Sequence, residues 1–320
     1  MKADPLCIEL TRGESIESIH FVDVAVVDSS GKEVVSFGDT DKAVLPRSAI
    51  KPIQALPLLE TGAAEKFHLH EIEIALACSS HSGEKLHVEA IENWLSKIGC
   101  RPEDLQCGRH DPMNFNLVLD EIHSERTPRV TANNCSGKHT GFLTVMRHLE
   151  IDHQNYLDPL HPLHADYVTP TLSEICHVDL SKQQPGIDGC GIPVWAVPIN
   201  GLARGWAELN HKPSASSLFE AMKNQAFYVA GTDRICTEII SSTKGKAIVK
   251  TGAEGVFCAA IPEEQIGVAL KVRDGASRAA AAALKWILGE HGVVDKKVSE
   301  PLTNHVGKHI GEIRVSLKQA

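Results

Sequence analysis

A proline near the start of the chain limits where the first helix can begin. Pro52 follows residues 47–51 (RSAIK) and precedes an apolar run over residues 53–59. Proline has no amide hydrogen, which a helix can spare only in its first turn. We therefore predict that this helix begins at position 48 or 49. Ser48 then lies at a helix N-terminus, with Lys51 one turn further on the same face.

This arrangement is typical of a Ser-x-x-Lys nucleophile. In such a pair an uncharged lysine accepts the hydroxyl proton, and the backbone amides at the helix start stabilise negative charge. The same pattern also occurs at residues 82–85 and 241–244, and a serine at this place can equally be a plain N-cap. Only the copy at Ser48 opens a strongly apolar helix, which Pro57 is expected to kink or end.

A second motif, Lys250-Thr251-Gly252, follows about two hundred positions later at the end of a predicted strand. Ser-x-x-Lys on a helix start together with Lys-Thr-Gly on a strand is the pair found in serine β-lactamases and penicillin-binding proteins. The presence of both motifs favours a catalytic site over the alternative, a chance Lys-Thr-Gly tripeptide on an exposed strand end.

The chemistry of such a site requires an activated serine. A lysine can take the proton of Ser48 only if burial or neighbouring positive charge lowers the lysine pKa, and Arg47 and Lys250 can supply such charge to Lys51. Glycine at position 252 allows a substrate to approach the strand edge. The amides of Ser48 and Ala253 can form an oxyanion hole.

The Ser-Asp-Asn motif of the β-lactamase set is missing. In a comparable position this chain has Ser79-Ser80-His81. Ser80 can relay a proton between the two lysines, or it can be an ordinary hydroxyl in a polar turn.

The order of elements predicts an α+β protein. Valine-rich alternation, a turn and a second apolar run predict a hairpin over residues 19–37, and short apolar segments after residue 247 read as sheet. Amphipathic and apolar patterns between them predict helices over residues 84–98, 140–149, 167–176, 202–209 and 216–228, and an alanine-rich helix over residues 276–290. We expect one antiparallel sheet built from both termini, with a helical middle region, as a single domain over residues 1–320.

Composition excludes several function classes. The formal charge of -9 and the lack of basic stretches argue against a nucleic-acid surface. Residues 1–13 lack the pattern of a secretory signal, and no apolar run reaches the length needed to cross a bilayer. Nine cysteines without paired spacing fit reduced thiols. A soluble, cytoplasmic protein is expected.

Metal ligands cannot be read from spacing here, because the sequence has no Cys-x-x-Cys and no His-Glu-x-x-His. By ligand preference, Cys135, His139 and Cys190 are the residues that suit Zn²⁺. Both cysteines lie in glycine-containing loops, and two ordinary buried thiols remain the alternative.

Taken together, these motifs resemble a known family. The blocks are Arg47-Ser48-x-x-Lys51-Pro52, Ser80-His81-Ser82, Asn134-Cys135-Ser136-Gly137-Lys138-His139, Asp188-Gly189-Cys190 and Lys250-x-Gly252. In this order they closely resemble the Rhizobium-type, or class 3, L-asparaginases. The resemblance runs from about residue 24 to residue 275. It implies a serine β-lactamase-like fold, a homodimer, and hydrolysis of L-asparagine to L-aspartate and ammonia.

The resemblance also implies residue roles. Ser48, the acylated nucleophile, pairs with Lys51, and Ser80 pairs with Lys250. The family's zinc site maps onto Cys135, Lys138 and Cys190 with a water molecule, so Lys138 replaces His139 as the third ligand, and the metal assists substrate binding. Arg47, His139 and Asp188 are expected beside the substrate, together with Gly252 and Ala253.

Two positions depart from the family pattern. Gln225-Ala226 stands where His-Pro is expected before residues 229–231, and Thr251 resembles a β-lactamase more than an asparaginase. Both leave substrate preference open. Glutamine is the nearer rival substrate, because one methylene discriminates by only about 1–3 kcal/mol. A β-lactamase or peptidase would act outside the cytoplasm. A zinc-binding or scaffolding protein without catalysis is the alternative from another class.

Overall fold

The structure is a computed structural model that describes residues 3–113, 118–119, 122–123, 127, 129–296 and 299–316. Every residue singled out above for catalysis, substrate binding or metal binding lies within these ranges. The segment over residues 101–129, whose pattern is weak and typical of loops, lies partly outside them. The chain forms two compact units. Unit 1 comprises residues 1–49, 196–210 and 249–320, and unit 2 comprises residues 50–195 and 211–248.

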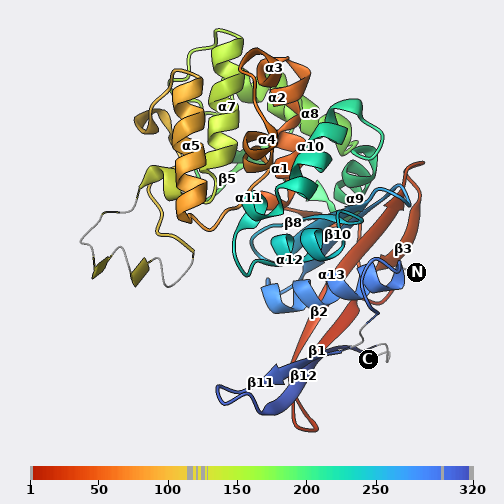
Figure 1. Cartoon of the computed structure of the whole chain (residues 1–320). Helices are drawn as coiled ribbons and strands as arrows, with labels where there is room; N and C mark the ends of the chain where they lie inside the picture. Colours follow the sequence, from red (N-terminus) through yellow and green to blue (C-terminus); the bar gives the residue numbers. More distant parts are fainter. Residues whose placement is uncertain are drawn as a thin grey trace. The chain divides into compact units, whose positions relative to one another are not determined.

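Unit 1 is built on an antiparallel sheet whose order, in the part of the chain described, is β11-β12-β1-β2-β10-β9-β8, with β3 also paired to β2 (Figure 1). The strands are β1 (Leu6–Arg12), β2 (Ser15–Asp28), β3 (Glu33–Phe37), β8 (Ile248–Thr251), β9 (Val256–Ile261), β10 (Ile266–Val272), β11 (Ser299–Thr303) and β12 (His309–Ser316). The predicted α+β architecture, with a sheet from both termini and a helical middle region, is confirmed.

Two helices cover opposite faces of this sheet. Helix α13 (Ser277–Glu290) packs on one face of the sheet. Val22 and Val24 both lie on this face, because alternate residues of a strand point to the same side. Helix α9 (Ile199–Glu208) packs on the other face at Gly267, where a side chain would meet the Ala203 carbonyl at 2.1 Å. Glycine there allows the helix and the strand to approach closely.

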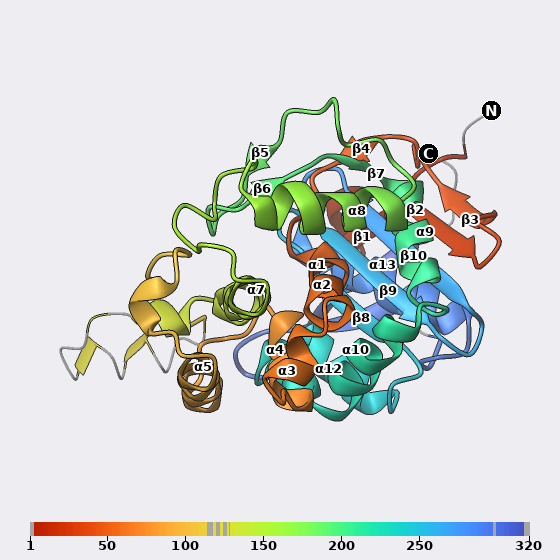
Figure 2. The same cartoon turned by 90° about the horizontal axis from the view of Figure 1, so that it is seen from above.

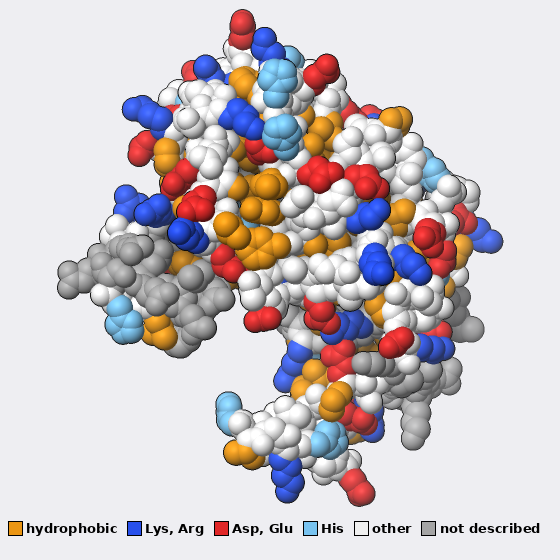
Figure 3. Space-filling view, viewed as in Figure 1, with side chains coloured by type: hydrophobic (Ala, Val, Ile, Leu, Met, Phe, Trp, Pro, Cys, Tyr) orange, Lys and Arg blue, Asp and Glu red, His pale blue; other side chains and the backbone are white. Residues whose placement is uncertain are grey.

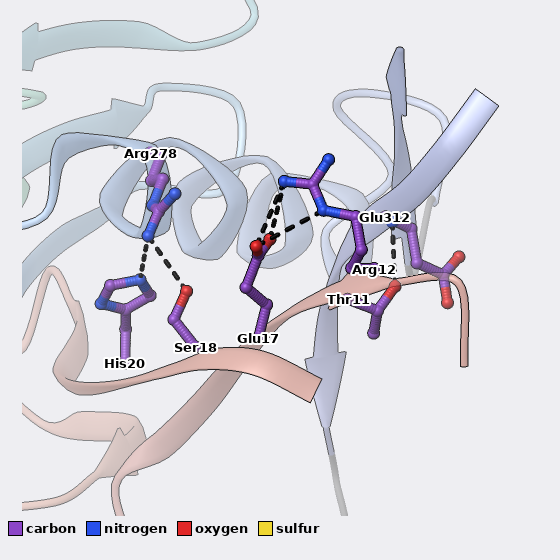
Figure 4. Close-up of polar contacts among 7 residues, drawn as sticks. All are labelled: Thr11, Arg12, Glu17, Ser18, His20, Arg278 and Glu312. Atoms are coloured by element: carbon purple, nitrogen blue, oxygen red, sulfur yellow. Dashed lines mark hydrogen bonds and ion pairs between the residues drawn. The ribbon is translucent and has the colours of Figure 1, made fainter. Parts of the chain in front are cut away.

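Side-chain contacts fix α13 to the N-terminal strands (Figure 4). Arg278 donates to the Ser18 hydroxyl at 3.1 Å and lies 3.3 Å from the His20 ring. The His20 Nδ1 also lies 2.6 Å from Asp274. Beyond the helix, the Thr11 hydroxyl accepts a hydrogen bond from the Glu312 amide, which supplements the β1–β12 pairing.

Unit 1 also contains the short pair β4 (Ala43–Val44) and β7 (Val197–Pro198). The predicted hairpin is confirmed as β2 and β3. On the face seen in Figure 3, acidic and basic side chains are interspersed rather than gathered into a patch of one sign.

Unit 2 is helical (Figure 2). Its helices are α1 (Lys51–Gln54), α2 (Leu56–Glu60), α3 (Ala63–Lys66), α4 (Glu71–Ala77), α5 (Lys85–Lys97), α7 (Ser136–His148), α8 (Thr169–Ile175), α10 (Pro213–Asn224), α11 (Ala226–Ala230) and α12 (Ile235–Ser242), with 3₁₀ turns η2 (Pro102–Asp104) and η3 (Val130–Ala132) and the π-helix η4 (Leu163–Val168). A short strand pair, β5 (Gly186–Ile187) and β6 (Pro193–Val194), flanks the glycine-rich loop over residues 188–192. Among the described helices, none is long and apolar enough to cross a membrane.

The first helix begins later than the sequence indicates. A 3₁₀ turn, η1 (Arg47–Ile50), carries Ser48, and the α-helix starts at Lys51 with Pro52 in its first turn. The expectation that Ser48 opens an α-helix is therefore wrong in detail, because the chain makes one tighter turn before it. The expected break is confirmed, since α1 ends at Gln54 and Pro57 lies in the first turn of α2.

Other helix predictions hold with shifted ends, except that the helix predicted over residues 216–228 is divided at Gln225 into α10 and α11. In α5 the residues His87, Ile91, Trp94 and Leu95 are buried, whereas Leu86 is 52% exposed. The π-helix η4 directly precedes α8.

Unit 2 buries several histidines as neutral rings. His164 donates from Nε2 to the Tyr156 carbonyl at 2.9 Å and contacts the Phe142 ring edge-on. Burial lowers the pKa of His164 to about 3 and holds the pKa values of His81 and His139 well below the usual range. A ring that is protonated in the unfolded chain must therefore lose that proton when the unit folds.

We predict that unfolding becomes easier in mild acid because of these rings. The pKa values of these rings in the folded protein lie below the unfolded value of 6.5. Their contribution to the free energy of unfolding is therefore complete above that pH and is lost as the pH falls toward the folded pKa. His164→Gln keeps an amide donor but does not titrate. Urea unfolding should show that the variant loses less stability, by up to about 1.4 kcal/mol per pH unit below about pH 6.5.

The exposed His211 supplies the control for this experiment. His211→Gln should leave the pH dependence of the unfolding free energy as in the wild type. If the unfolding free energy of the wild type and of both variants had the same pH dependence, the effect could not be assigned to His164.

Candidate active site

Ser48 lies in a turn with unusual backbone geometry. The residue before it, Arg47, has a φ of 51°, in the left-handed region that a side chain other than glycine rarely adopts. The Ala49 amide donates to the Pro46 carbonyl at 3.1 Å and closes the turn, and Ser48 is half-buried. Strained backbone of this kind gathers at functional sites, where the surrounding structure holds it.

Strand β8 lies directly against this turn within unit 1. A side chain at Gly252 would meet the carbonyls of Pro46 and Val256 at 2.8 Å and the Ala49 amide at 3.1 Å. The glycine that sequence analysis assigned to substrate access therefore also lets the Ser48 turn pack on the sheet. Its role in binding substrate stays a prediction.

Lys250 is completely buried in β8, and its Nζ donates to the Thr251 carbonyl at 2.8 Å. Ala253 follows on an exposed stretch before β9.

Lys51 and Ser80 come together in unit 2. Lys51, 1% exposed, donates to the Ser80 hydroxyl at 3.0 Å and to the Ser79 carbonyl at 2.5 Å. Its Nζ also lies 3.5 Å from the Asn134 carbonyl and 3.2 Å from the Cys135 sulfur. The start of α1, the end of α4 and the start of α7 thus converge on one amine. The contact joins Lys51 to Ser80, whereas the relay by Ser80 and the pairs Ser48–Lys51 and Ser80–Lys250 stay predictions.

Cys135, Lys138 and Cys190 also gather in unit 2. Cys135 caps the N-terminus of α7, Lys138 lies in its first turn, and Cys190 lies in the loop between β5 and β6. The Lys138 Nζ donates to the Cys190 sulfur at 2.9 Å, and the Cys135 and Cys190 side chains lie close enough to shift each other's pKa. All three side chains are at least 95% buried.

The proton distribution in this cluster follows from these contacts. The hydrogen bond from Cys135 and the Lys138 charge outweigh burial and lower the pKa of Cys190 to about 4. The same hydrogen bond and burial raise the pKa of Cys135 to about 12. Burial would lower the pKa of Lys138, but the two sulfurs hold it above its usual value. At neutral pH, Cys190 is therefore a thiolate that accepts from a thiol and an ammonium.

These three side chains fit a zinc ion by donor chemistry. Thiolate sulfur and neutral amine nitrogen can both donate electron pairs to Zn²⁺, and a buried thiolate already carries the charge the ion needs. Within the described residues, no group of three or more histidine, cysteine, aspartate or glutamate side chains is placed to hold a metal. The set chosen from ligand preference alone, with His139 as third ligand, is therefore not assembled.

His139 instead binds Tyr156, a residue that the sequence analysis missed. The Gln106 amide donates to the Tyr156 hydroxyl at 2.9 Å, and that hydroxyl lies 2.7 Å from His139 Nδ1. The two groups share one hydrogen bond whose direction is set by the tautomer of the His139 ring, and the other ring nitrogen is Nε2. That nitrogen is buried and has no partner among the described residues. No sequence motif marks Tyr156, because it reaches the site from a loop seventeen positions away.

Asp188 begins the loop that presents Cys190. Its amide donates to the Ile192 carbonyl at 2.9 Å, and the Gly191 amide donates back to the Asp188 carbonyl at 2.8 Å. The loop is thus a closed turn that needs glycine at position 191, where φ is 89°.

Comparison with known proteins decides the family. The family model for L-asparaginase II matches residues 8–315, which is nearly the whole chain. The chain belongs to the L-asparaginase II family. Family membership implies a hydrolase with a small-molecule substrate.

The other comparisons add less. No curated protein matches the sequence. Among solved structures, the chain is similar to a β-lactamase from Mycobacterium bovis, with 10% identity, a TM-score of 0.40, and coverage of 85% of this chain and 95% of that chain.

We predict that Gly252→Ala disturbs the Ser48 turn. The added methyl group would press on two backbone carbonyls, so the turn must shift, at a cost of about 1–3 kcal/mol. Denaturant unfolding should show this loss. The matched control is Gly186→Ala, whose methyl group would meet its nearest atom at 3.6 Å. Equal stability of the two variants would show that the turn does not require glycine at position 252.

Proposed function

We propose that the chain hydrolyses L-asparagine to L-aspartate and ammonia through an acyl-enzyme on Ser48. Membership of the L-asparaginase II family supports the reaction. The observation that carries the mechanism is the Lys51 amine, buried in contact with the Ser80 hydroxyl at 3.0 Å and only three residues after Ser48.

In the first half of the proposed reaction the Ser48 oxygen attacks the side-chain carbonyl carbon. Lys51 takes the hydroxyl proton, and the amides of Ser48 and Ala253 stabilise the oxyanion. The C–N bond then breaks, and ammonia leaves with a proton that returns through the lysines. In the second half a lysine takes a proton from the attacking water, the ester C–O bond breaks, and the Ser48 oxygen regains a proton as aspartate leaves.

The contacts of Lys51 support its use as a base. A neutral amine has two N–H donors and one lone pair, and the carbonyls of Ser79 and Asn134 can accept both hydrogens. In the proposed base form, the lone pair of the nitrogen takes the proton of the Ser48 hydroxyl. We propose that Ser80 and Lys250 form the second pair and carry protons between the two half-reactions.

Substrate binding is assigned on the family resemblance. Arg47, His139 and Asp188 are proposed to contact the amino acid, with Gly252 beside it. Cys135, Lys138 and Cys190 would hold Zn²⁺, which supplies a Lewis acid that assists substrate binding. A homodimer and a cytoplasmic location are part of the same proposal.

The test is ammonia release from L-asparagine and, separately, from L-glutamine. Ser48→Ala should lower release from asparagine at least about a thousandfold, because the acyl-enzyme cannot form. The control is Ser241→Ala, which removes the serine of another Ser-x-x-Lys copy at an exposed position and should retain activity. Undiminished release by the Ser48 variant would remove the proposed nucleophile. Greater release from glutamine would move the substrate to the longer amide.

A second prediction concerns zinc. The binding of Zn²⁺ must displace one proton from Cys135 and one from Lys138, whereas Cys190 is already ionised. The zinc affinity should therefore rise about a hundredfold per pH unit near neutrality. Competition with a chromophoric chelator at several pH values measures this slope. Cys135→Ser should bind much less zinc, and undiminished zinc in that variant would refute the proposed ligand set.

A further inference from the structure

Ser80 lies in a segment that belongs to no helix or strand. Residues 79–84 connect the end of α4 to the start of α5. Two acceptors of the buried Lys51 amine lie in this segment, the Ser79 carbonyl and the Ser80 hydroxyl. Because no regular structure fixes these residues, the position of the Ser80 hydroxyl depends on what the segment contacts elsewhere in unit 2.

Residues 229–232, at the end of α11 and in the turn after it, bind this segment along its length. The Ser80 amide donates to the Val229 carbonyl at 2.9 Å. Two residues further on, the Ser82 hydroxyl donates to the Ala230 carbonyl at 2.8 Å. The position of the Ser80 backbone is therefore coupled to that of residues 229–232.

Glu84 closes this contact at its far end. Its Oε1 accepts from the Thr232 amide and its Oε2 from the Thr232 hydroxyl, each at 2.8 Å. Hydrogen bonds to a carboxylate are stronger than those between neutral groups. Gly231 allows the close approach, since a side chain there would meet the Glu84 Oε1 and the Ser82 hydroxyl, each at 2.5 Å. The turn at residues 231–232 is thus shaped to receive the Glu84 carboxylate.

We propose that Glu84 is a positioning residue for Ser80. By binding Thr232, its carboxylate holds residues 229–232 against the Ser80 segment, and this keeps the Ser80 hydroxyl in contact with the Lys51 amine. Glu84 itself touches neither the substrate nor a reacting atom. The proposal rests on the proposed function, in which Ser80 carries protons between the two lysines.

The opposite side of the segment is held without Glu84. The buried His81 ring accepts from the Gly83 amide at Nδ1, at 3.1 Å, so its Nε2 carries the hydrogen and donates to the Ser136 hydroxyl at 2.9 Å. Loss of the Glu84 carboxylate therefore frees one side of the segment and leaves the other side attached to α7. A variant at Glu84 should fold, with a displacement confined to residues near Ser80.

The first test measures steady-state ammonia release from L-asparagine by variants of the full chain. Glu84→Ala should lower kcat about tenfold to a hundredfold and change KM less than about threefold, because the relay is displaced while the groups assigned to the substrate stay in place. Glu84→Gln should restore most of the rate. Its amide oxygen can accept from the Thr232 amide, and its NH₂ group can donate to the Thr232 hydroxyl. Circular dichroism gives the folded fraction, so that kcat refers to folded protein.

The matched control is Glu89→Ala. Glu89 also lies on α5, but it is exposed, and its carboxylate lies 3.7 Å from the Lys85 amine one turn away. Removal of this carboxylate from the same helix should leave kcat and KM as in the wild type.

Hydrogen exchange at the Ser80 amide supplies a readout that needs no activity. The Val229 carbonyl holds this amide, so Glu84→Ala should speed its exchange at least about tenfold, whereas Glu84→Gln and Glu89→Ala should leave it slow. Mass spectrometry of overlapping peptides, without substrate, assigns the change to residues 79–82.

Three results would overturn the proposal. The first is unchanged exchange at Ser80 in Glu84→Ala, and the second is faster exchange with the kcat of the wild type. The third is a Glu84→Gln protein as slow as Glu84→Ala, because the hydrogen bonds to Thr232 could then not be the cause. A wild type that releases no ammonia from asparagine would instead refute the proposed function, and exchange would still decide whether Glu84 holds Ser80.

Discussion

The burial of Lys51 is the constraint on which the arrangement of unit 2 depends. A buried amine must be given acceptors or be neutral, since an unpaired charge away from water is very costly. Lys51 meets this requirement with two carbonyls, a hydroxyl and a sulfur, which come from the segments at the end of α4 and the start of α7. The helices cannot shift independently without leaving that amine unsatisfied. The interaction thereby fixes Ser80 and Cys135 around one point.

The thiol cluster poses the same electrostatic problem with the opposite sign. The Cys190 sulfur, whose pKa is lowered, is stabilised by the Lys138 amine and the Cys135 thiol, and the Cys135 sulfur in turn lies 3.2 Å from the Lys51 amine. An apolar core would be simpler to fold, which is why buried charged networks of this kind draw attention to function. Here the network joins the residues assigned to proton transfer with those assigned to zinc.

Sequence patterns predicted the sheet and most helices because apolar periodicity is local. The β2–β3 hairpin, the Pro57 break and the alanine-rich α13 all follow from neighbouring residues. Strands β1 and β11 were missed, as their partners lie far along the chain and their own patterns are weak. The 3₁₀ turn at Ser48 was also missed, since proline restricts a helix start without specifying the turn before it. Nor could sequence alone find Tyr156, whose role arises only from the packing of its loop on His139.

The central sheet carries a consequence for the order in which the protein can form during synthesis. Strand β1 pairs with β12, so residues 7–10 find their partners only after residues 313–316 have left the ribosome. Unit 2, in contrast, is composed of residues 50–195 and 211–248, and all of them emerge well before that point. The helical unit can therefore gather its core while β1 still exposes an unpaired edge. Such an edge invites pairing with other chains. The interval between the synthesis of β1 and of β12 is thus the period in which the edge of β1 is open to other chains.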